Sequence, residues 1–137
     1  MKSMKSLDSQ IRHKSFLLDA CKRRIGQLEG MIAELKRQSS ELKQDLDLEH
    51  SRTKISDANH FAYSPLARSL TQRHDNLNRS IRELDAKLEN AKAEASEAID
   101  NLNELLQERA RREEHANQST SKDRSAMGGI MASALIV

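Results

Sequence analysis

The sequence is poor in the residues on which most compact folds depend. Only 2% of its 137 residues are aromatic, and it contains no tryptophan, one proline, four glycines and one cysteine. Aromatic side chains bury the most area per residue, so their scarcity argues against a compact α/β enzyme fold. The shortage of proline and glycine argues against a loop-rich or β-rich fold, which needs many turn residues. A chain of this length accommodates one domain rather than two with separate cores.

The chain also has little that would direct it to a partner or a compartment. Its 23 Lys and Arg residues and 21 Asp and Glu residues leave a net charge of +2, so no overall attraction to nucleic acid is expected. The lone Cys21 excludes an internal disulfide framework and a cysteine-based metal site. No apolar run approaches the roughly 20 residues that span a bilayer, and no signal peptide is evident. We therefore expect a cytoplasmic protein without direct membrane insertion.

What the sequence does contain is typical of long helices, and two heptad patterns run along it. The first seam consists of Leu7, Ile11, Lys14, Leu18, Cys21, Ile25, Leu28, Ile32, Leu35, Ser39, Leu42, Leu46 and Glu49. The second consists of Ala67, Leu70, His74, Leu77, Ile81, Leu84, Leu88, Ala91, Ala95, Ala98, Leu102, Leu105 and Arg109. Ten of the thirteen positions in the first seam and eleven of the thirteen in the second are apolar, which predicts a coiled coil.

The break between the two patterns predicts where one helix ends and the next begins. Residues 54–64 interrupt both registers and contain Asp and Asn, which favour turns. Ser64 is a good N-cap, and Pro65 is a good first helical residue because its missing N–H would be unpaired there. We expect helices at about 5–53 and 65–116, each roughly 70 Å long, to fold back on one another.

The predicted fold class is therefore all-α, an antiparallel two-helix coiled-coil hairpin. The hairpin is expected to occupy residues 1–117, followed by a tail at 118–137 that is disordered or docks weakly on a partner. Charge favours this topology, because residues 1–24 carry +5 and the residues expected to face them, 92–115, carry −3. A parallel dimer would instead place the basic block against its own copy.

Residues that carry chemistry are scarce, and we predict no enzyme activity, no cofactor and no metal. There is no phosphate-binding loop or paired-histidine zinc motif, and the five histidines have no useful spacing. Cys21 fits a small apolar seam position better than a nucleophile paired with His13. The basic series at Arg68, Arg73, Arg79 and Arg82 could touch phosphates. Solvated helix flanks are favoured, because acidic residues interleave and no aromatics accompany the arginines.

Apolar residues outside the seams are the most informative feature. They are Phe16, Leu17, Met31, Leu48, Phe61, Tyr63 and Leu66. Two interpretations of the connector aromatics stay open: they plug the end of the hairpin, or they anchor a partner, as aromatic residues do at interfaces. Replacing Phe61 and Tyr63 with Ala is expected to impair function and leave helicity intact, whereas a loss of helicity would favour the plug.

The connector also resembles a known family. The segment from Ile55 to Pro65 is similar to the inter-helix segment of the FliJ proteins of flagellar export, in the form found in alphaproteobacteria. Four short segments also resemble the family: Lys22–Arg24 and Met31–Leu35 before the connector, and Gln72–Leu77 and Ser80–Leu84 after it. The resemblance covers about residues 3–115, and the tail has no counterpart in the family.

The resemblance implies a non-catalytic component of the type III export machine. FliJ proteins are small cytoplasmic antiparallel coiled coils, associated peripherally with the inner membrane at the flagellar base. They bind the export ATPase FliI, contact the export gate protein FlhA and help to handle substrates and export chaperones. The implied role is an adaptor between the ATPase ring and the gate during flagellum assembly, with no nucleic-acid partner.

Two sets of residues are the candidates for partner binding. The connector end offers His60, Phe61, Tyr63 and Leu66, which we assign to the gate. The open end, where the termini meet, offers Leu7, Ile11, Leu102 and Leu105, which we assign to the ATPase ring.

Three other functions stay open. An injectisome secretion stalk would have the same architecture. A structural coiled-coil scaffold would form a concentration-dependent parallel dimer and would have no use for the connector aromatics. A nucleic-acid-binding or membrane-surface helix would bind in a manner that weakens steeply with salt, which the mixed charge disfavours.

Overall fold

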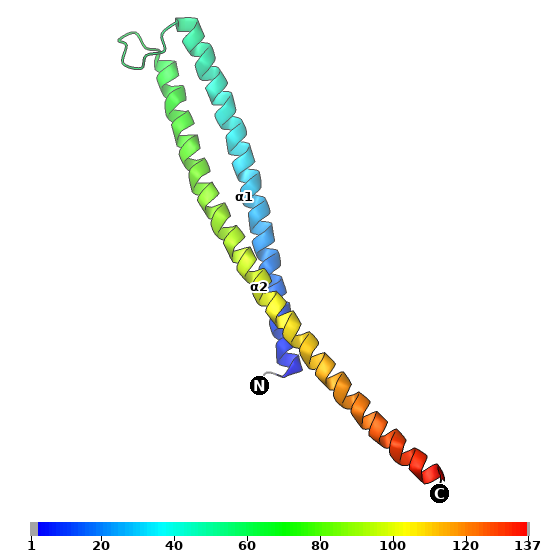
Figure 1. The fold of residues 1–137 in the computed structure, drawn as a ribbon. Coiled ribbons are helices and arrows are strands. Elements are labelled where there is room, and N and C mark those ends of the chain that lie inside the picture. The colour runs from blue at the N-terminus through cyan, green and yellow to red at the C-terminus, as the bar shows by residue number, and fades with distance from the viewer. Residues whose placement is uncertain (1–2, 137) are drawn as a thin grey trace. The chain divides into compact units, whose positions relative to one another are not determined.

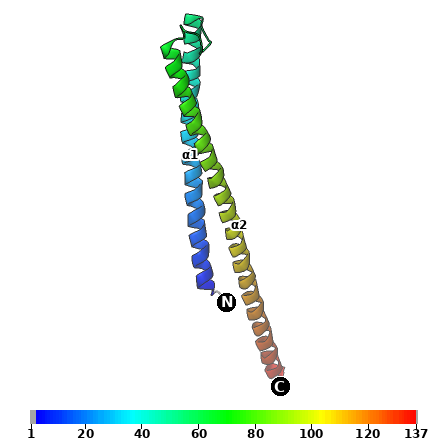
Figure 2. The ribbon, with the colours of Figure 1, turned by 90° about the vertical axis from the view of Figure 1, so that its left-hand side faces the viewer.

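The computed structural model describes residues 3–136 of the chain, and the side-chain surroundings of residues 3–121. It contains two helices, α1 at Met4–Thr53 and α2 at Pro65–Ile136. The two helices run in opposite directions and are joined by the connector at residues 54–64 (Figures 1 and 2). The predicted all-α antiparallel hairpin is therefore confirmed.

The two heptad seams account for the packing of the hairpin. Every position of both predicted seams is buried or half-buried. The few non-apolar members follow the same rule, since Ser39 and Glu49 are buried and Lys14, His74 and Arg109 are half-buried. The 3-and-4 spacing of apolar residues is thus sufficient to identify the face on which each helix packs.

The contacts divide the chain into two compact units. The connector unit comprises Ala20–Ala95, and the terminal unit comprises Met1–Asp19 together with Ser96–Val137. Each unit contains parts of both helices and is described by itself below.

In the connector unit an apolar cluster lies beside the turn. Its buried members are Leu46, Tyr63, Ala67 and Leu70, and the partly buried Leu42 and Ile55 pack against them. Further along the seam a polar layer joins the two helices, where the Ser39 hydroxyl donates a hydrogen bond of 2.9 Å to Oδ1 of Asn78. A polar pair at such a position favours one register over others, because a slip would leave it unpaired.

In the terminal unit, apolar residues and an ion pair join the two helices along the seam. Leu7 is 1% exposed, and Ile11 and Ala98 are also buried. Nη1 of Arg109 lies 3.5 Å from Oδ1 of Asp8, which links the two helices. Asp8 is an acidic residue of the basic segment 1–24, and Arg109 is a basic residue of the acidic segment 92–115. Among the described residues, no ion pair joins a basic residue of the first segment to an acidic residue of the second.

The helix ends show why the chain turns where it does. The Ser3 hydroxyl accepts a hydrogen bond of 3.1 Å from the N–H of Ser6 and caps the start of α1. Lys54, just after α1, has a φ of 59°, the left-handed conformation that commonly ends helices. At the start of α2, the Ser64 hydroxyl accepts a hydrogen bond of 3.2 Å from the N–H of Ala67, which confirms the predicted N-cap.

Beyond residue 117, α2 continues to Ile136 without a marked break. The side chains of residues 122–137 lie outside the described part of the structure, so the docking expected of the tail stays a prediction. Within the described residues, neither helix has a stretch long and apolar enough to span a membrane.

Candidate functional site

The base of the connector is held by a buried carboxylate. Glu49, on the last turns of α1, is 6% exposed, and its Oε1 accepts a hydrogen bond of 2.7 Å from the Ser64 hydroxyl. Arg52 reaches the same carboxylate at 3.1 and 2.5 Å. Because the Ser64 hydroxyl also caps α2, Glu49 orients the group that starts the second helix. A carboxylate beside a helix N-terminus is further stabilised by the helix dipole.

These contacts favour the ionised form of Glu49. The hydrogen bonds from Arg52 and then Ser64 lower the pKa of its carboxyl to about 2, against an ordinary value of 4.5. Arg52 itself is an exposed side chain whose pKa the same carboxylate raises. The glutamate at this seam position therefore has a structural role in the turn.

Tyr63 fills the end of the hairpin. Its side chain is buried, and its hydroxyl lies 2.8 Å from Nε2 of His50 on α1. The guanidinium of Arg68 lies over its ring, 5.4 Å from the centroid, and also donates a hydrogen bond of 3.2 Å to the Ala58 carbonyl. Tyr63 is thus fixed from both sides, which supports the plug interpretation for this residue.

The outer part of the connector is an ordered turn built around His60. Its N–H donates to the Asp57 carbonyl at 3.0 Å, and its carbonyl accepts from the N–H of Tyr63 at 3.1 Å. Its ring Nδ1 accepts a hydrogen bond of 3.0 Å from the N–H of Ala62, so Nδ1 carries no proton in this arrangement. The side chain of Asp57 adds a further bond, accepting at 2.9 Å from the N–H of Asn59.

Phe61 projects from this turn into solvent. It is 97% exposed, more than any other large apolar residue among residues 3–121, and its ring stacks on that of His60 with centroids 4.7 Å apart. Leu66, at the start of α2, is 53% exposed. An aromatic side chain held in solvent by an ordered turn has lost much of its freedom before any partner arrives, which lowers the entropic cost of binding.

The predicted partner-binding residues therefore fall into two groups. At the connector end, His60, Phe61 and Leu66 are exposed, whereas Tyr63 is buried. At the open end, Leu7 and Ile11 are buried in the terminal unit. Leu102 and Leu105 are half-buried there. The two aromatics that sequence reasoning treated together thus have different environments.

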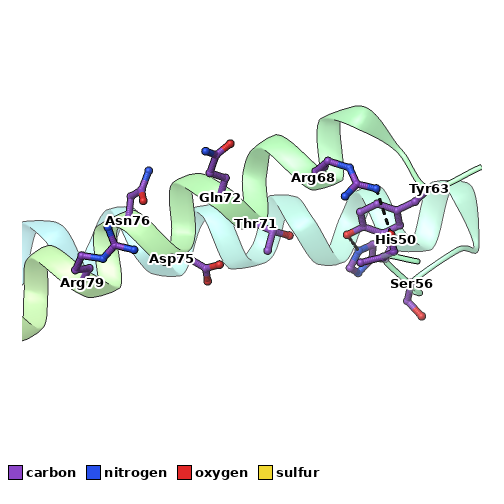
Figure 3. A pocket seen from close by; sticks show the side chains of 10 residues that line it. His50, Ser56, Tyr63, Arg68, Thr71, Gln72, Asp75, Asn76 and Arg79 are labelled. Atoms are coloured by element: carbon purple, nitrogen blue, oxygen red, sulfur yellow. Dashed lines mark hydrogen bonds between the residues drawn. The ribbon is translucent and has the colours of Figure 1, made fainter. Parts of the chain in front are cut away.

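A groove beside the connector is a feature that sequence reasoning missed. It has a volume of about 620 Å³. The groove is lined by one residue of α1, three of the connector and six of α2 (Figure 3). They are His50; Ser56, Ala58 and Tyr63; and Arg68, Thr71, Gln72, Asp75, Asn76 and Arg79. The spacing of the α2 members indicates one outer helix face. The connector residues could not be placed from the sequence, because a turn without a heptad pattern carries no register.

Among the residues described, no three His, Cys, Asp or Glu side chains are placed to hold a metal ion. Comparison of the chain with protein-family models, with curated proteins and with solved structures gives no match.

Proposed function

We propose that this chain is a non-catalytic adaptor of flagellar type III protein export, which links the export ATPase ring to the export gate during flagellum assembly. The proposal rests on the resemblance of the connector to that of the FliJ proteins and on the two-helix antiparallel hairpin. The observation that carries it is Phe61, an aromatic side chain held 97% exposed on that same connector.

The two aromatic residues of the connector have different roles in this proposal. Tyr63 and Glu49 secure the turn from inside, and Phe61 remains free to enter a pocket on a partner. Exposed aromatic anchors of this kind supply a large share of the binding energy at protein interfaces. In this proposal His60, Phe61 and Leu66 contact the gate protein FlhA, and Tyr63 acts through the shape of the turn.

The open end is assigned to the export ATPase FliI. Leu7 and Ile11 are already covered within the terminal unit, so they hold the helices together there rather than offer free surface. The half-buried Leu102 and Leu105 remain the predicted apolar contacts at this end. Location in the cytoplasm, at the inner face of the membrane around the flagellar base, is part of the same proposal.

The test is binding of the full chain to the cytoplasmic domain of the gate protein from the same cell. Phe61→Ala is expected to weaken binding by about tenfold or more, because truncating an interface anchor costs about 2 kcal/mol. Phe16→Ala is the matched control, since it removes another exposed phenylalanine, 63% exposed, away from the connector.

The control should bind as tightly as the unchanged chain, and both variants should keep the helical circular dichroism of the parent. Equal binding by both variants would remove the connector from the proposal. It would favour a structural coiled-coil scaffold, which has no use for Phe61.

A further inference from the structure

The groove beside the connector has no part in the proposed contacts with the ATPase and the gate. Its volume of about 620 Å³ lies within the range of protein sites that bind small ligands and short peptide segments. It is formed within the connector unit, with α2 as its floor and connector residues Ser56 and Ala58 at one end.

Charged groups are spaced along this groove. Figure 3 shows Arg68 toward the connector, Arg79 at the far end and Asp75 between them, all on α2. Arg68 is held in place by the Ala58 carbonyl and the Tyr63 ring. Within residues 3–121, Arg79 makes no ion pair or side-chain hydrogen bond, so its guanidinium is available.

Amide side chains complete the lining. Gln72 and Asn76 both reach the groove and both are exposed. Each amide offers a hydrogen-bond donor and an acceptor, which can pair with the C=O and N–H groups of a peptide backbone. A nucleic acid fits less well, because Asp75 would repel its phosphates. The two rings that line the groove are also poorly placed to stack on a base, since Tyr63 is buried, His50 is half-buried and each contacts the other.

We propose that the groove binds a short extended peptide segment in which two acidic side chains flank a basic one. Arg68 and Arg79 are eleven positions apart, or about 16 Å along the helix. Side chains on one face of an extended peptide recur every second residue at about 6.6 Å, so acids four residues apart span about 13 Å. The long arginine side chains cover the difference, and a basic residue midway faces Asp75.

The probe is the blocked, fluorescein-labelled peptide Glu-Thr-Lys-Thr-Glu, whose binding to the full chain is followed by fluorescence polarisation at low salt. We expect saturable binding that weakens about tenfold in Arg79→Gln, because an arginine–carboxylate contact is lost. Arg82→Gln makes the same charge change on the same helix outside the groove, and it should alter binding less than twofold. Replacing both peptide glutamates with glutamine should weaken binding by at least tenfold.

Three results would overturn the proposal. Equal weakening by the Arg79 and Arg82 variants would mean attraction by overall charge rather than a site. The absence of saturable binding up to about 1 mM peptide would mean no useful affinity. Displacement of the peptide by an oligonucleotide that binds more tightly would assign the surface to nucleic acid. The proposal does not depend on the export role, so a failure here leaves that role untouched.

Discussion

At the residue scale, Phe61 and Tyr63 show how two aromatics with similar sequence surroundings acquire different roles. Tyr63 can hydrogen-bond to His50, so its ring enters the interior with its polar group satisfied. Phe61 lies on the outward side of the turn that His60 organises. From the sequence both residues could plug the hairpin or anchor a partner, because the choice depends on the conformation of a turn that has no periodicity.

Truncating each aromatic separately should distinguish these roles. Tyr63→Ala is expected to lower the free energy of unfolding by about 3 kcal/mol, because it empties a buried site, whereas Phe61→Ala should change it by less than about 0.5 kcal/mol. Urea unfolding followed by far-ultraviolet circular dichroism measures both. An equal loss in the two variants would mean that Phe61 also packs against the hairpin in solution.

Glu49 makes stability depend on pH in the acid range. Its pKa is about 2 in the folded chain and 4.5 ordinarily, so the folded state binds fewer protons there than the unfolded state. The stabilisation is therefore complete above about pH 5 and is lost as the pH falls from 4.5 towards 2. Glu49→Gln should remove this part of the pH dependence, as followed by the thermal midpoint between pH 2 and 6.

Glu34→Gln is the matched control for that experiment. The pKa of Glu34 is also lowered to about 2 by Arg37, but this pair joins exposed side chains within a single turn of α1. Solvent screening makes such pairs weak, so most of the acid dependence should survive in the control. A control that flattens the profile as strongly as Glu49→Gln would show that the buried carboxylate has no special role.

At the element scale, the sequence contained enough to identify both packing faces. The seams from Leu7 to Glu49 and from Ala67 to Arg109 are buried or half-buried at every position. Period and residue type determine this result, because an apolar stripe on a helix must be covered. The Ser64 cap was predictable for a similar reason, since the signal is local.

The sequence pattern could not predict contacts between residues far apart in the chain. Ser39 was recognisable as a break in the apolar seam, but its partner Asn78 lies at an off-seam position of the other helix. Glu49 was likewise visible as a charged residue in the seam, but its hydrogen bond to the capping residue Ser64 could not be predicted. The groove beside the connector depends on where Ser56 and Ala58 fold, which no local rule specifies.

Two glycines inside α1 lower the stability of that helix. A Cβ added at Gly26 or at Gly30 would meet nothing within 4 Å. Each Gly→Ala change should therefore raise the free energy of unfolding by about 1 kcal/mol, through helix propensity alone. Thermal and urea unfolding give the change.

The reverse change in α2, at the exposed Ala93, is the control. Ala93→Gly should lower the free energy of unfolding by a similar amount. Destabilisation of either glycine variant would contradict this prediction. It would mean that this face of α1 contacts another molecule or a second copy of the chain in solution.

At the scale of the whole molecule, the fold was predictable from the sequence, whereas the proposed function rests on a few connector residues. Two heptad patterns and one break specify an antiparallel hairpin, and the structure has that hairpin. The opposite net charges of residues 1–24 and 92–115 favoured the same orientation. The inter-helix pair Asp8–Arg109, however, joins an acid of the basic segment to a base of the acidic segment. Exposed pairs contribute little, so seam burial has the larger part in holding the helices together.

The adaptor role depends on the connector residues, because a hairpin of this kind can serve many purposes. In the proposed role Phe61, Leu66 and the ordered turn around His60 form the partner-binding surface, for which a plain scaffold would have no use. A scaffold predicts a dimer of the chain with itself, whereas an adaptor predicts a defined complex with the export ATPase.

The most direct test is analytical ultracentrifugation of the purified chain with the export ATPase from the same cell, in the presence of nucleotide. The adaptor role predicts a complex that carries one chain per ATPase hexamer. Sedimentation of the chain as a tight, salt-insensitive dimer, with no bound ATPase, would contradict it.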